Sequence, residues 1–318
     1  HLCEELIKQN FKVKALVEYN SSNSIGWLND LSKNKLNSIE IIYGDIRDVE
    51  LIHKVSKNID IIFHLAALIA IPYSYEAPRS YIETNVIGTL NVLQATIKNS
   101  VSKLISTSTS EVYGTARYTP IDEKHILQAQ SPYSASKIAA DHLIEAYVKT
   151  YNVPAVTLRP FNTYGPRQSE RAVIPTIIRQ ILDPKCKEIK IGDTSPIRDF
   201  NYVKDTANAF INLALAKNKV TDFGAAYNAG SGKSVSIKET IDLISRITNH
   251  KKKIISSKER FRPKKSEVMN LIASSEKLYK LTGWKPNTSL NSGLEKTINW
   301  WKINFQKNKF SRNSNYKI

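Results

Sequence analysis

Short apolar runs that alternate with helical periodicity along the first half of the chain constrain the fold more than any other feature. The apolar runs span residues 13–17, 39–43, 59–65, 103–106 and 155–158. Segments with apolar residues at helical spacing separate them, at 1–10, 48–56, 79–99 and 133–150. Buried strands that alternate with amphipathic helices are typical of a parallel sheet with helices on both faces. We therefore predict an α/β fold with a doubly wound parallel sheet.

The rhythm becomes less regular after about residue 166. Helical periodicity covers 174–182, 204–216, 236–248 and 290–306, with a short strand at 189–191. We predict a first domain at 1–165, to which 198–226 return, and a smaller α/β domain made mainly of 166–306. The polar and basic residues 307–318 predict a disordered tail.

Composition excludes several classes of protein. Hydrophobic residues make up 41% of the chain and charged residues 24%, which excludes disorder throughout. No apolar run approaches the roughly 18 residues of a membrane span, so we expect no membrane segment. The two cysteines, Cys3 and Cys186, cannot build a disulfide framework and suit a reducing cytoplasm. The histidines show no short ligand spacing, so we expect no metal site.

The net charge of +17 has two interpretations. A nucleic-acid-binding protein would gather its bases in one stripe, whereas here they are scattered. We therefore favour a Lys-rich surface with an anionic small substrate, and no nucleic-acid partner. The densest basic stretches, Lys251–Lys253 and 307–318, are expected to be solvated.

The strongest chemical pattern joins a strand end to the helix that follows. Ser106 to Gly114 read STSTSEVYG at the carboxyl end of the predicted strand 103–106, where open α/β sheets bind ligands. Tyr133 and Lys137 lie four residues apart on one helix face. An ammonium about 4 Å from the phenol would lower the tyrosine pKa by about three units, so that Tyr133 could act as a base. The alternative is an ordinary surface pair, but the Ser/Thr cluster favours the functional interpretation.

Further segments match one known family in order along the chain. They are 64–67 (HLAA), Asn85, 159–166 (RPFNTYGP), 198–205 (RDFNYVKD), 227–230 (YNAG) and 262–263 (RP). Together they resemble the extended short-chain dehydrogenase/reductase family, in its nucleotide-sugar epimerase/dehydratase branch, over residues 1 to about 303. The resemblance implies a Rossmann-like sheet, a substrate-binding second domain, and a cytoplasmic enzyme. It also implies a homodimer built on helices 80–99 and 133–150.

The beginning of the chain departs from the family pattern. The family starts with a strand and a Gly-rich loop that cradles the cofactor pyrophosphate. His1 follows directly after the place where that loop would end. We therefore expect an N-terminally incomplete chain with weak cofactor binding. An inactive, cofactor-free scaffold is the alternative of another class.

The resemblance implies NAD as the cofactor. Glu18 would accept hydrogen bonds from the adenosine ribose and repel the extra phosphate of NADP, unless it is merely an exposed carboxylate. Lys137 would hold the nicotinamide ribose, and Tyr133 would lie beside the nicotinamide. The remaining expected contacts are Asp45, Ile46, Leu65, Ala66, Ala67 and Asn85.

The residues after the strand indicate the reaction. By resemblance, Tyr133 takes the C4 hydroxyl proton and Thr109 binds the C4 oxygen. Ser110 and Glu111 follow, and this Thr-Ser-Glu order resembles the GDP-mannose 4,6-dehydratases. Glu111 would remove the C5 proton, with acid help from Ser110 or a water at C6. A 4-epimerase or a uronate decarboxylase remains the alternative enzyme, and a merely structural Glu111 the plainer one.

A finer resemblance concerns the substrate. Residues 19–21, 71–75, 77–78 and 127–133 resemble the legionaminate-pathway GDP-N-acetylglucosamine 4,6-dehydratases. We expect Arg198 and Arg262 to bind the substrate diphosphate, because a guanidinium matches phosphate oxygens. Asn162 is a further expected contact, and Glu267 is expected near the nucleotide ribose. Surface ion pairs are the alternative for both arginines.

Overall fold

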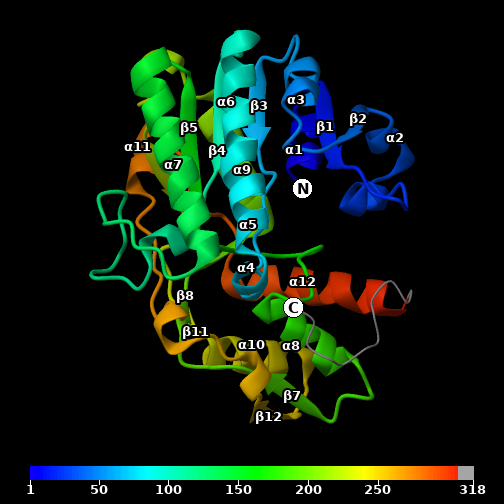
Figure 1. Ribbon diagram of the computed structural model, residues 1–318. Coiled ribbons are helices and arrows are strands. Elements are labelled where there is room, and N and C mark those ends of the chain that lie inside the picture. The colour runs from blue at the N-terminus through cyan, green and yellow to red at the C-terminus, as the bar shows by residue number, and fades with distance from the viewer. Residues whose placement is uncertain (307–318) are drawn as a thin grey trace.

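The computed structural model describes residues 1–306 and confirms the predicted α/β class (Figure 1). Its longer strands are β1 (Val13–Glu18), β2 (Ile39–Gly44), β3 (Ile61–His64), β4 (Lys103–Thr107), β5 (Ala155–Pro160), β6 (Asn162–Tyr164), β7 (Glu188–Ile191), β9 (Phe200–Tyr202), β10 (Ala226–Ala229) and β12 (Lys253–Ser256). Two short strands are β8 (Ile197–Arg198) and β11 (Val235–Ser236). The α-helices are α1 (Leu2–Lys8), α2 (Lys33–Leu36), α3 (Val49–Val55), α4 (Ile71–Glu76), α5 (Pro78–Tyr81), α6 (Gly88–Lys98), α7 (Pro132–Tyr151), α8 (Val173–Leu182), α9 (Val203–Leu215), α10 (Ile237–Thr248), α11 (Glu276–Thr282) and α12 (Leu290–Gln306).

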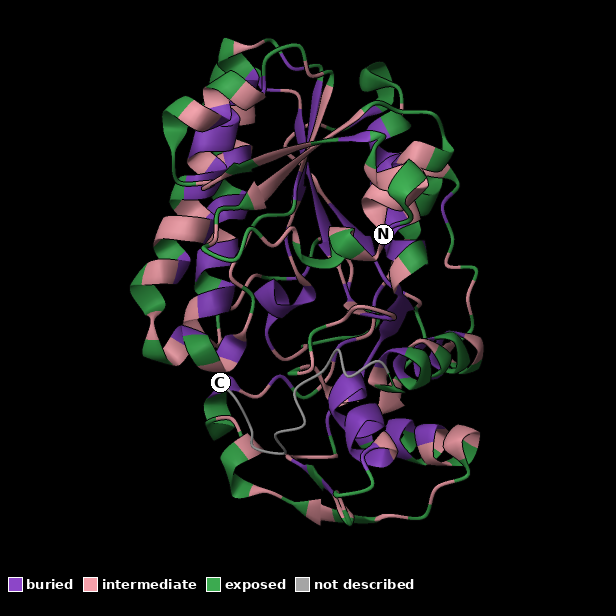
Figure 2. Ribbon diagram, turned by 90° about the vertical axis from the view of Figure 1, so that its right-hand side faces the viewer, coloured by how far each residue is buried: buried purple, intermediate pink, exposed green. Residues whose placement is uncertain are grey.

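Four parallel strands form the main sheet in the order β10–β5–β4–β3. The register sets Ser106 of β4 beside Thr157 of β5, so the carboxyl ends of these strands lie at one edge. Leu93 of α6 and Ile144 of α7 pack with Leu104 in one buried cluster. Residues of α9 and α11 pack with the sheet in a second buried cluster. Figure 2 shows the strands of this sheet largely buried between the helices.

β1 and β2 form a separate parallel pair. Among residues 1–306, no ladder joins β1 to β3, so each of these strands keeps one edge without a partner strand. The residues of β1 are half-buried or exposed, whereas the first four residues of β4 are buried. The expectation of a further strand and a Gly-rich loop stays a prediction.

The segment 79–99, predicted as one helix, contains a π-helical turn. α5 ends at Tyr81, the π-helix η2 spans Ile82–Ile87, and α6 begins at Gly88. A π turn holds one residue more than an α turn, and such turns often occur at functional sites. Apolar periodicity over 20 residues is too coarse to reveal one inserted residue, which is why the sequence predicted an uninterrupted helix.

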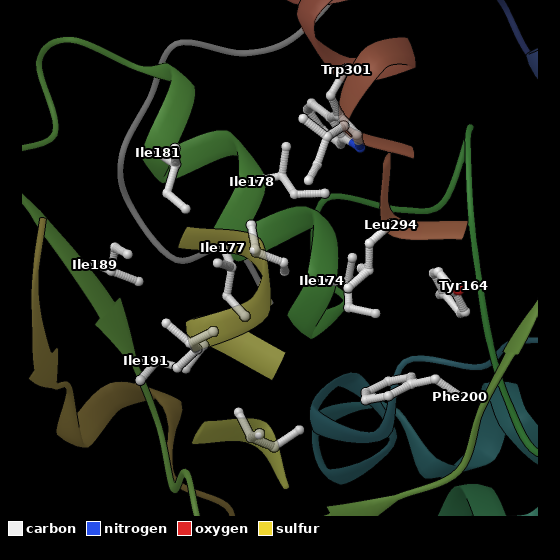
Figure 3. Close-up of a cluster of buried hydrophobic side chains, with 14 of the residues drawn as sticks. Tyr164, Ile174, Ile177, Ile178, Ile181, Ile189, Ile191, Phe200, Leu294 and Trp301 are labelled. Carbon is white, nitrogen blue, oxygen red and sulfur yellow. The ribbon is translucent and has the colours of Figure 1, made fainter. Parts of the chain in front are cut away.

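A second body of the molecule contains α8, α10, β7 and β12, with α12 between it and the main sheet (Figure 1). β7 pairs in parallel with β12. Ile177 and Ile181 of α8 pack with Ile189 of β7 and Trp301 of α12 in a single buried cluster, drawn in Figure 3. The domain limits given above stay predictions, although α9 and β10 clearly lie on and in the main sheet.

The prediction that Lys252 is solvated is wrong. Its ammonium donates to the carbonyls of Gln180 at 2.7 Å, Ile181 at 3.1 Å and Asp183 at 2.7 Å. These carbonyls end α8, and a cation satisfies unpaired carbonyls at a helix C-terminus. The neighbouring Lys251 and Lys253 are exposed. The predicted tail at 307–318 lies outside the described residues.

Two kinds of feature do not occur in residues 1–306. No helix there has the length and apolarity to cross a bilayer. No group of three or more His, Cys, Asp or Glu side chains there is placed to hold a metal ion.

Candidate active site

The polar residues after β4 continue into the short 3-10 helix η3 (Ser110–Tyr113). Thr109 is extended and caps this helix, because its hydroxyl accepts a hydrogen bond from Glu111 N at 3.2 Å. Ser110 and Glu111 are both buried. The cap therefore fixes the positions of Thr109 and Glu111 relative to each other.

α7 begins beside this strand end and carries the tyrosine and lysine pair. Ser131 caps the helix with a capping box, and Pro132 occupies its first turn, where a proline costs no hydrogen bond. Tyr133 and Lys137 lie on the buried face, 6% and 3% exposed. The Tyr133 hydroxyl shares a hydrogen bond with the Thr109 side chain. The structure thus brings together these predicted residues from β4 and α7.

The expected lowering of the Tyr133 pKa is wrong for this structure. Burial raises the pKa of Tyr133, the hydrogen bond with Thr109 lowers it in part, and the charge of Glu111 raises it again. The Lys137 ammonium donates instead to the carbonyl of Thr107 at 2.5 Å, and burial lowers the pKa of Lys137 to about 8. Desolvation of the phenolate therefore outweighs the lysine charge that the spacing suggests.

Glu111 is a buried carboxylate whose charge acts on two other predicted site residues. Its negative charge is among the influences that raise the pKa of Tyr133. Burial lowers the pKa of Arg198, and the charge of Glu111 is the largest influence opposing that effect. Among residues 1–306 no salt bridge involves Glu111, since Arg198 pairs with Glu267. The charge of the Glu111 carboxylate therefore acts on both the phenol and the guanidinium.

Arg198 and Arg262 meet at one carboxylate. Nη2 of Arg198 donates to Glu267 Oε1 at 2.8 Å, and Nε of Arg262 lies 3.6 Å from Glu267 Oε2. Nη1 of Arg262 is buried and finds no hydrogen-bond partner within the described part of the chain. A guanidinium nitrogen that is left unpaired beside this carboxylate suits an anionic ligand. The structure thus places the two predicted arginines together, with Glu267 between them.

Asn162 begins β6 near this charged group. The β6–β9 ladder sets Asn162 beside Phe200, two residues after Arg198. The Asn162 Oδ1 atom is buried, and none of residues 1–306 donates a hydrogen bond to it. Such an oxygen requires an explanation, and a ligand donor supplies one.

Asn85 ties the loop after β3 to α7. Its amide nitrogen donates to Leu68 O at 3.0 Å and to Ser136 Oγ at 2.9 Å, and its oxygen accepts from Leu68 N at 2.8 Å. The Nε2 atom of His64, the last residue of β3, lies 3.0 Å from Thr89 Oγ1. Burial lowers the pKa of His64 to about 3, so the ring is neutral. Asn85 therefore anchors the backbone of Leu68, in the loop after β3 that is predicted to contact the cofactor.

The predicted cofactor residues lie at the carboxyl ends of β1, β2 and β3. Glu18 is exposed where β1 ends, and Leu65 and Ala66 are exposed after β3, with Ala67 half-buried. A cavity of about 450 Å³ opens at this edge; its lining is Asp45, Arg47, Asp48, Glu83 and Ile87. None of these lining residues belongs to the Thr109–Tyr133 group, so the cavity is separate from the chemical centre.

Ile46, which follows β2, contacts α6 through both its carbonyl and its side chain. Its carbonyl accepts a hydrogen bond from Asn91 Nδ2 at 3.0 Å. Its side chain lies so close to Gly88 that an added Cβ would come within 3.0 Å. Asp45, by contrast, is bound to Arg47, whose Nη2 lies 2.5 Å from the carboxylate.

Several neighbours of the site were not predicted. Tyr81 sets its ring edge against Tyr133, with centroids 6.2 Å apart. Tyr75, in the same apolar cluster, shares a 2.6 Å hydrogen bond with Ser266. Asp141 lies one turn after Lys137 on α7. The sequence shows this i, i+4 spacing, so Asp141 could have been predicted as a neighbour of Lys137.

A family model described as GDP-mannose 4,6 dehydratase matches residues 1–297. The chain belongs to this family. The chain is similar to dTDP-D-glucose 4,6-dehydratase of Mus musculus, with 34% identity over 273 residues. The match covers 84% of this chain and 75% of the relative. UDP-glucose 4-epimerase of Halalkalibacterium halodurans is 30% identical over 286 residues, 84% of each chain.

Solved structures confirm the Rossmann-like fold of this GDP-mannose 4,6 dehydratase family member. MoeE5, solved with UDP-glucuronic acid and NAD, matches with a TM-score of 0.83 and 26% identity, over 96% of this chain and 95% of that one. Both dehydratases and epimerases of nucleotide sugars are therefore relatives. The finer resemblance to legionaminate-pathway enzymes stays a prediction.

Proposed function

We propose that this protein is a nucleotide-sugar 4,6-dehydratase, which forms a 4-keto-6-deoxy sugar nucleotide. The observation that carries the proposal is the buried Glu111 carboxylate, whose charge acts on both Tyr133 and Arg198. Epimerisation at C4 needs no second acid or base. Loss of water from C6 needs a group that removes the C5 proton, and we assign that step to Glu111.

Tyr133 serves as the first base and takes the proton of the sugar C4 hydroxyl. Thr109, already hydrogen-bonded to the phenol, orients the C4 oxygen. Because burial raises the pKa of Tyr133, its anion depends on a nearby cation. Lys137, with a pKa of about 8, is mainly charged at neutral pH and supplies that cation.

Glu111 acts once C4 is a carbonyl, which acidifies the hydrogen at C5. The carboxylate takes that proton, the C5–C6 double bond forms, and the C6 hydroxyl leaves as water. Ser110, buried beside Glu111, or a water donates the proton that the leaving hydroxyl needs. Glu111 then returns its proton to C5.

The carboxyl edge of β1, β2 and β3 fits NAD. Glu18 is exposed to meet the ribose hydroxyls, and the cavity beside Asp45 and Ile46 has room for an aromatic base. The residues Leu65–Ala67, followed by Leu68 whose backbone Asn85 holds, would cover the dinucleotide, with Lys137 on its second ribose. When bound, NAD supplies the two-electron chemistry that oxidises C4 and reduces C6. The NAD in the MoeE5 structure supports this choice.

The cluster of Arg198, Arg262 and Glu267 is the proposed diphosphate site, with Asn162 beside it. The unpaired Nη1 of Arg262 and Oδ1 of Asn162 are available for a ligand. The segments at 71–75 and 127–133 extend the proposal to a GDP-N-acetylglucosamine type of substrate. A cytoplasmic homodimer also stays part of the proposal, and light scattering tests the dimer.

The test uses GDP-, UDP- and dTDP-hexoses in heavy water with the wild-type protein and Glu111→Gln. We expect the wild type to form a 4-keto-6-deoxy product that carries deuterium at C5. Glu111→Gln should lose exchange at C5 but keep some oxidation at C4. Mass spectrometry and proton NMR of the product give both results.

Glu276→Gln is the matched control, because Glu276 is an exposed carboxylate on α11 paired with Lys280. It should behave as the wild type. A C4 epimer formed equally by the wild type and Glu111→Gln would replace the proposal with 4-epimerisation, the activity named for one relative.

A further inference from the structure

Asp141 is a buried carboxylate behind the proposed catalytic pair. Its Oδ2 accepts a hydrogen bond from Ser108 Oγ at 2.9 Å and from Arg159 Nε at 3.0 Å. Nη2 of Arg159 lies 3.0 Å from the same oxygen. Asp141 and Arg159 are 7% and 6% exposed. A buried ion pair contributes little net stability, so a role in fixing geometry explains it better.

The far end of Arg159 continues this network. Its Nη1 donates to the Tyr113 hydroxyl at 3.0 Å, which donates to Asn228 Oδ1 at 2.7 Å. Tyr113 and Asn228 are fully buried. The network therefore links β4, α7, β5, η3 and β10. A satisfied buried network of this kind selects one arrangement of its elements.

Three consecutive residues at the end of β4 are each held by α7. Lys137 holds the carbonyl of Thr107, Asp141 holds the hydroxyl of Ser108, and Tyr133 shares a hydrogen bond with the next residue. Only the middle contact involves no residue with a proposed chemical role. It is also the contact that Arg159 secures from β5.

We infer that Asp141 is a positioning residue, which fixes the end of β4 against α7 through Ser108 and Arg159 so that Tyr133 and Lys137 act in one geometry. The inference rests on the proposed function only for the first step, proton removal at C4, which dehydratases and epimerases share.

The charges of this pair also act on the proposed bases. Burial lowers the pKa of Lys137 and raises that of Tyr133, and the charge of Asp141 raises both. Arg159, beside Asp141, offsets that charge. The titratable groups that face these residues from other elements are His64, Tyr81, Glu111, Tyr113 and, next to Tyr113, Glu123.

The experiment compares Asp141→Asn with the wild type. Loss of the carboxylate leaves Arg159 uncompensated, so the pKa values of Tyr133 and Lys137 both fall. We expect the pH profile of kcat/KM to move to lower pH by about one unit. We expect kcat to fall about tenfold, with a smaller change in KM, because the bases are less well placed.

A second readout needs no turnover. NMR of ring-labelled tyrosine, with Tyr133→Phe to assign the signal, follows the Tyr133 pKa directly. It should fall in Asp141→Asn and rise in Arg159→Gln, which leaves the carboxylate uncompensated. Ser108→Ala removes a hydrogen bond but no charge, so kcat should fall while the pH profile stays in place.

Glu145→Gln is the matched control, because Glu145 lies one turn further along α7 and pairs with Lys149 near the surface. It should change neither kcat nor the Tyr133 pKa. The inference is overturned if Asp141→Asn lowers only the melting temperature, with the Tyr133 pKa and the profile unmoved. If Asp141→Asn does not fold, Arg159→Gln decides: a rise in the Tyr133 pKa supports the inference, and no rise overturns it. Product identity does not enter these readouts, so a failed dehydratase assignment is distinguishable.

Discussion

The two edges where ligands are expected to meet differ in how they are built. At the end of β4, the chemical groups are buried and bound to one another through α7. At the ends of β1 and β2, the strands are half-buried, Glu18 is exposed, and a cavity opens beside Asp45. The groups at the first edge are buried and bound to one another, whereas those at the second edge are more exposed.

The difference follows from what each edge has to do. Proton transfer depends on charges that act in a water-poor site, where their interactions are strong. Binding of a nucleotide depends on accessible donors, acceptors and a cavity. Substitutions at the first edge should therefore have large effects on rate and stability, and those at the second edge small ones.

The largest effect should come from Tyr133→Phe. Removal of the hydroxyl removes the proposed base and its hydrogen bond with Thr109, so kcat should fall about 10³-fold. Tyr151→Phe, on the exposed end of the same helix, is the control and should leave kcat unchanged. Steady-state kinetics on both variants checks this, and a loss below about tenfold would contradict the role of Tyr133.

A large effect on stability should come from His64 at low pH. The folded chain holds this imidazole neutral, with a pKa of about 3, whereas the unfolded chain protonates it near 6.5. The unfolded state therefore binds more protons between these values, and the free energy of unfolding falls as pH falls through that window. Urea unfolding of His64→Gln should show a flatter pH dependence.

His142→Gln is the control for that measurement, because His142 lies on the exposed face of α7. It should keep the wild-type slope. An equally steep slope in His64→Gln would mean that other groups control acid unfolding.

A moderate effect should come from Asn85→Ala. It leaves the backbone groups of Leu68 without their partners, which should lower the free energy of unfolding by about 1–3 kcal/mol. Urea unfolding tests this, with Asn291→Ala as the control, since Asn291 is exposed and its side chain donates a hydrogen bond to the exposed Glu295. Equal stabilities would mean that the loop after β3 needs no anchor.

The smallest effect should come from Glu18→Gln. Because Glu18 is exposed, the free energy of unfolding should change by less than about 0.5 kcal/mol. The affinity for NAD, measured by calorimetry, should fall about fivefold through the weaker hydrogen bonds to ribose. A marked loss of stability would contradict this difference between the two edges, because Glu18 would then contribute to the stability of the fold.

The regular elements could be predicted because periodicity reports burial. Strands such as β4 and β5, and α7 with its Ser131 cap, lie within a few residues of their predicted positions. Short elements such as β8 and β11 could not be found, since two residues carry no period. Their pairing depends on contacts between segments far apart in the chain.

The chemical residues could be proposed from motifs, but their electrostatics could not. The i, i+4 spacing placed Tyr133 and Lys137 on one face, yet the pKa of Tyr133 is raised, because burial depends on what packs around the ring. Similarly, no spacing indicated that Glu267 joins Arg198 to Arg262. Charge pairing across distant loops is a property of the folded chain only.

The π turn at Ile82–Ile87 has a consequence for insertions and deletions in this helix. Each residue of a helix is rotated by about 100° from the one before it. The extra residue of the π turn therefore changes the direction in which the side chains of α6 point relative to those before the turn. The π turn itself supplies Asn85 to the loop after β3, and α6 supplies Asn91 to the carbonyls after β2. Deleting one residue here would leave only one of these two loops with its anchor, although hydrophobicity and length would barely change.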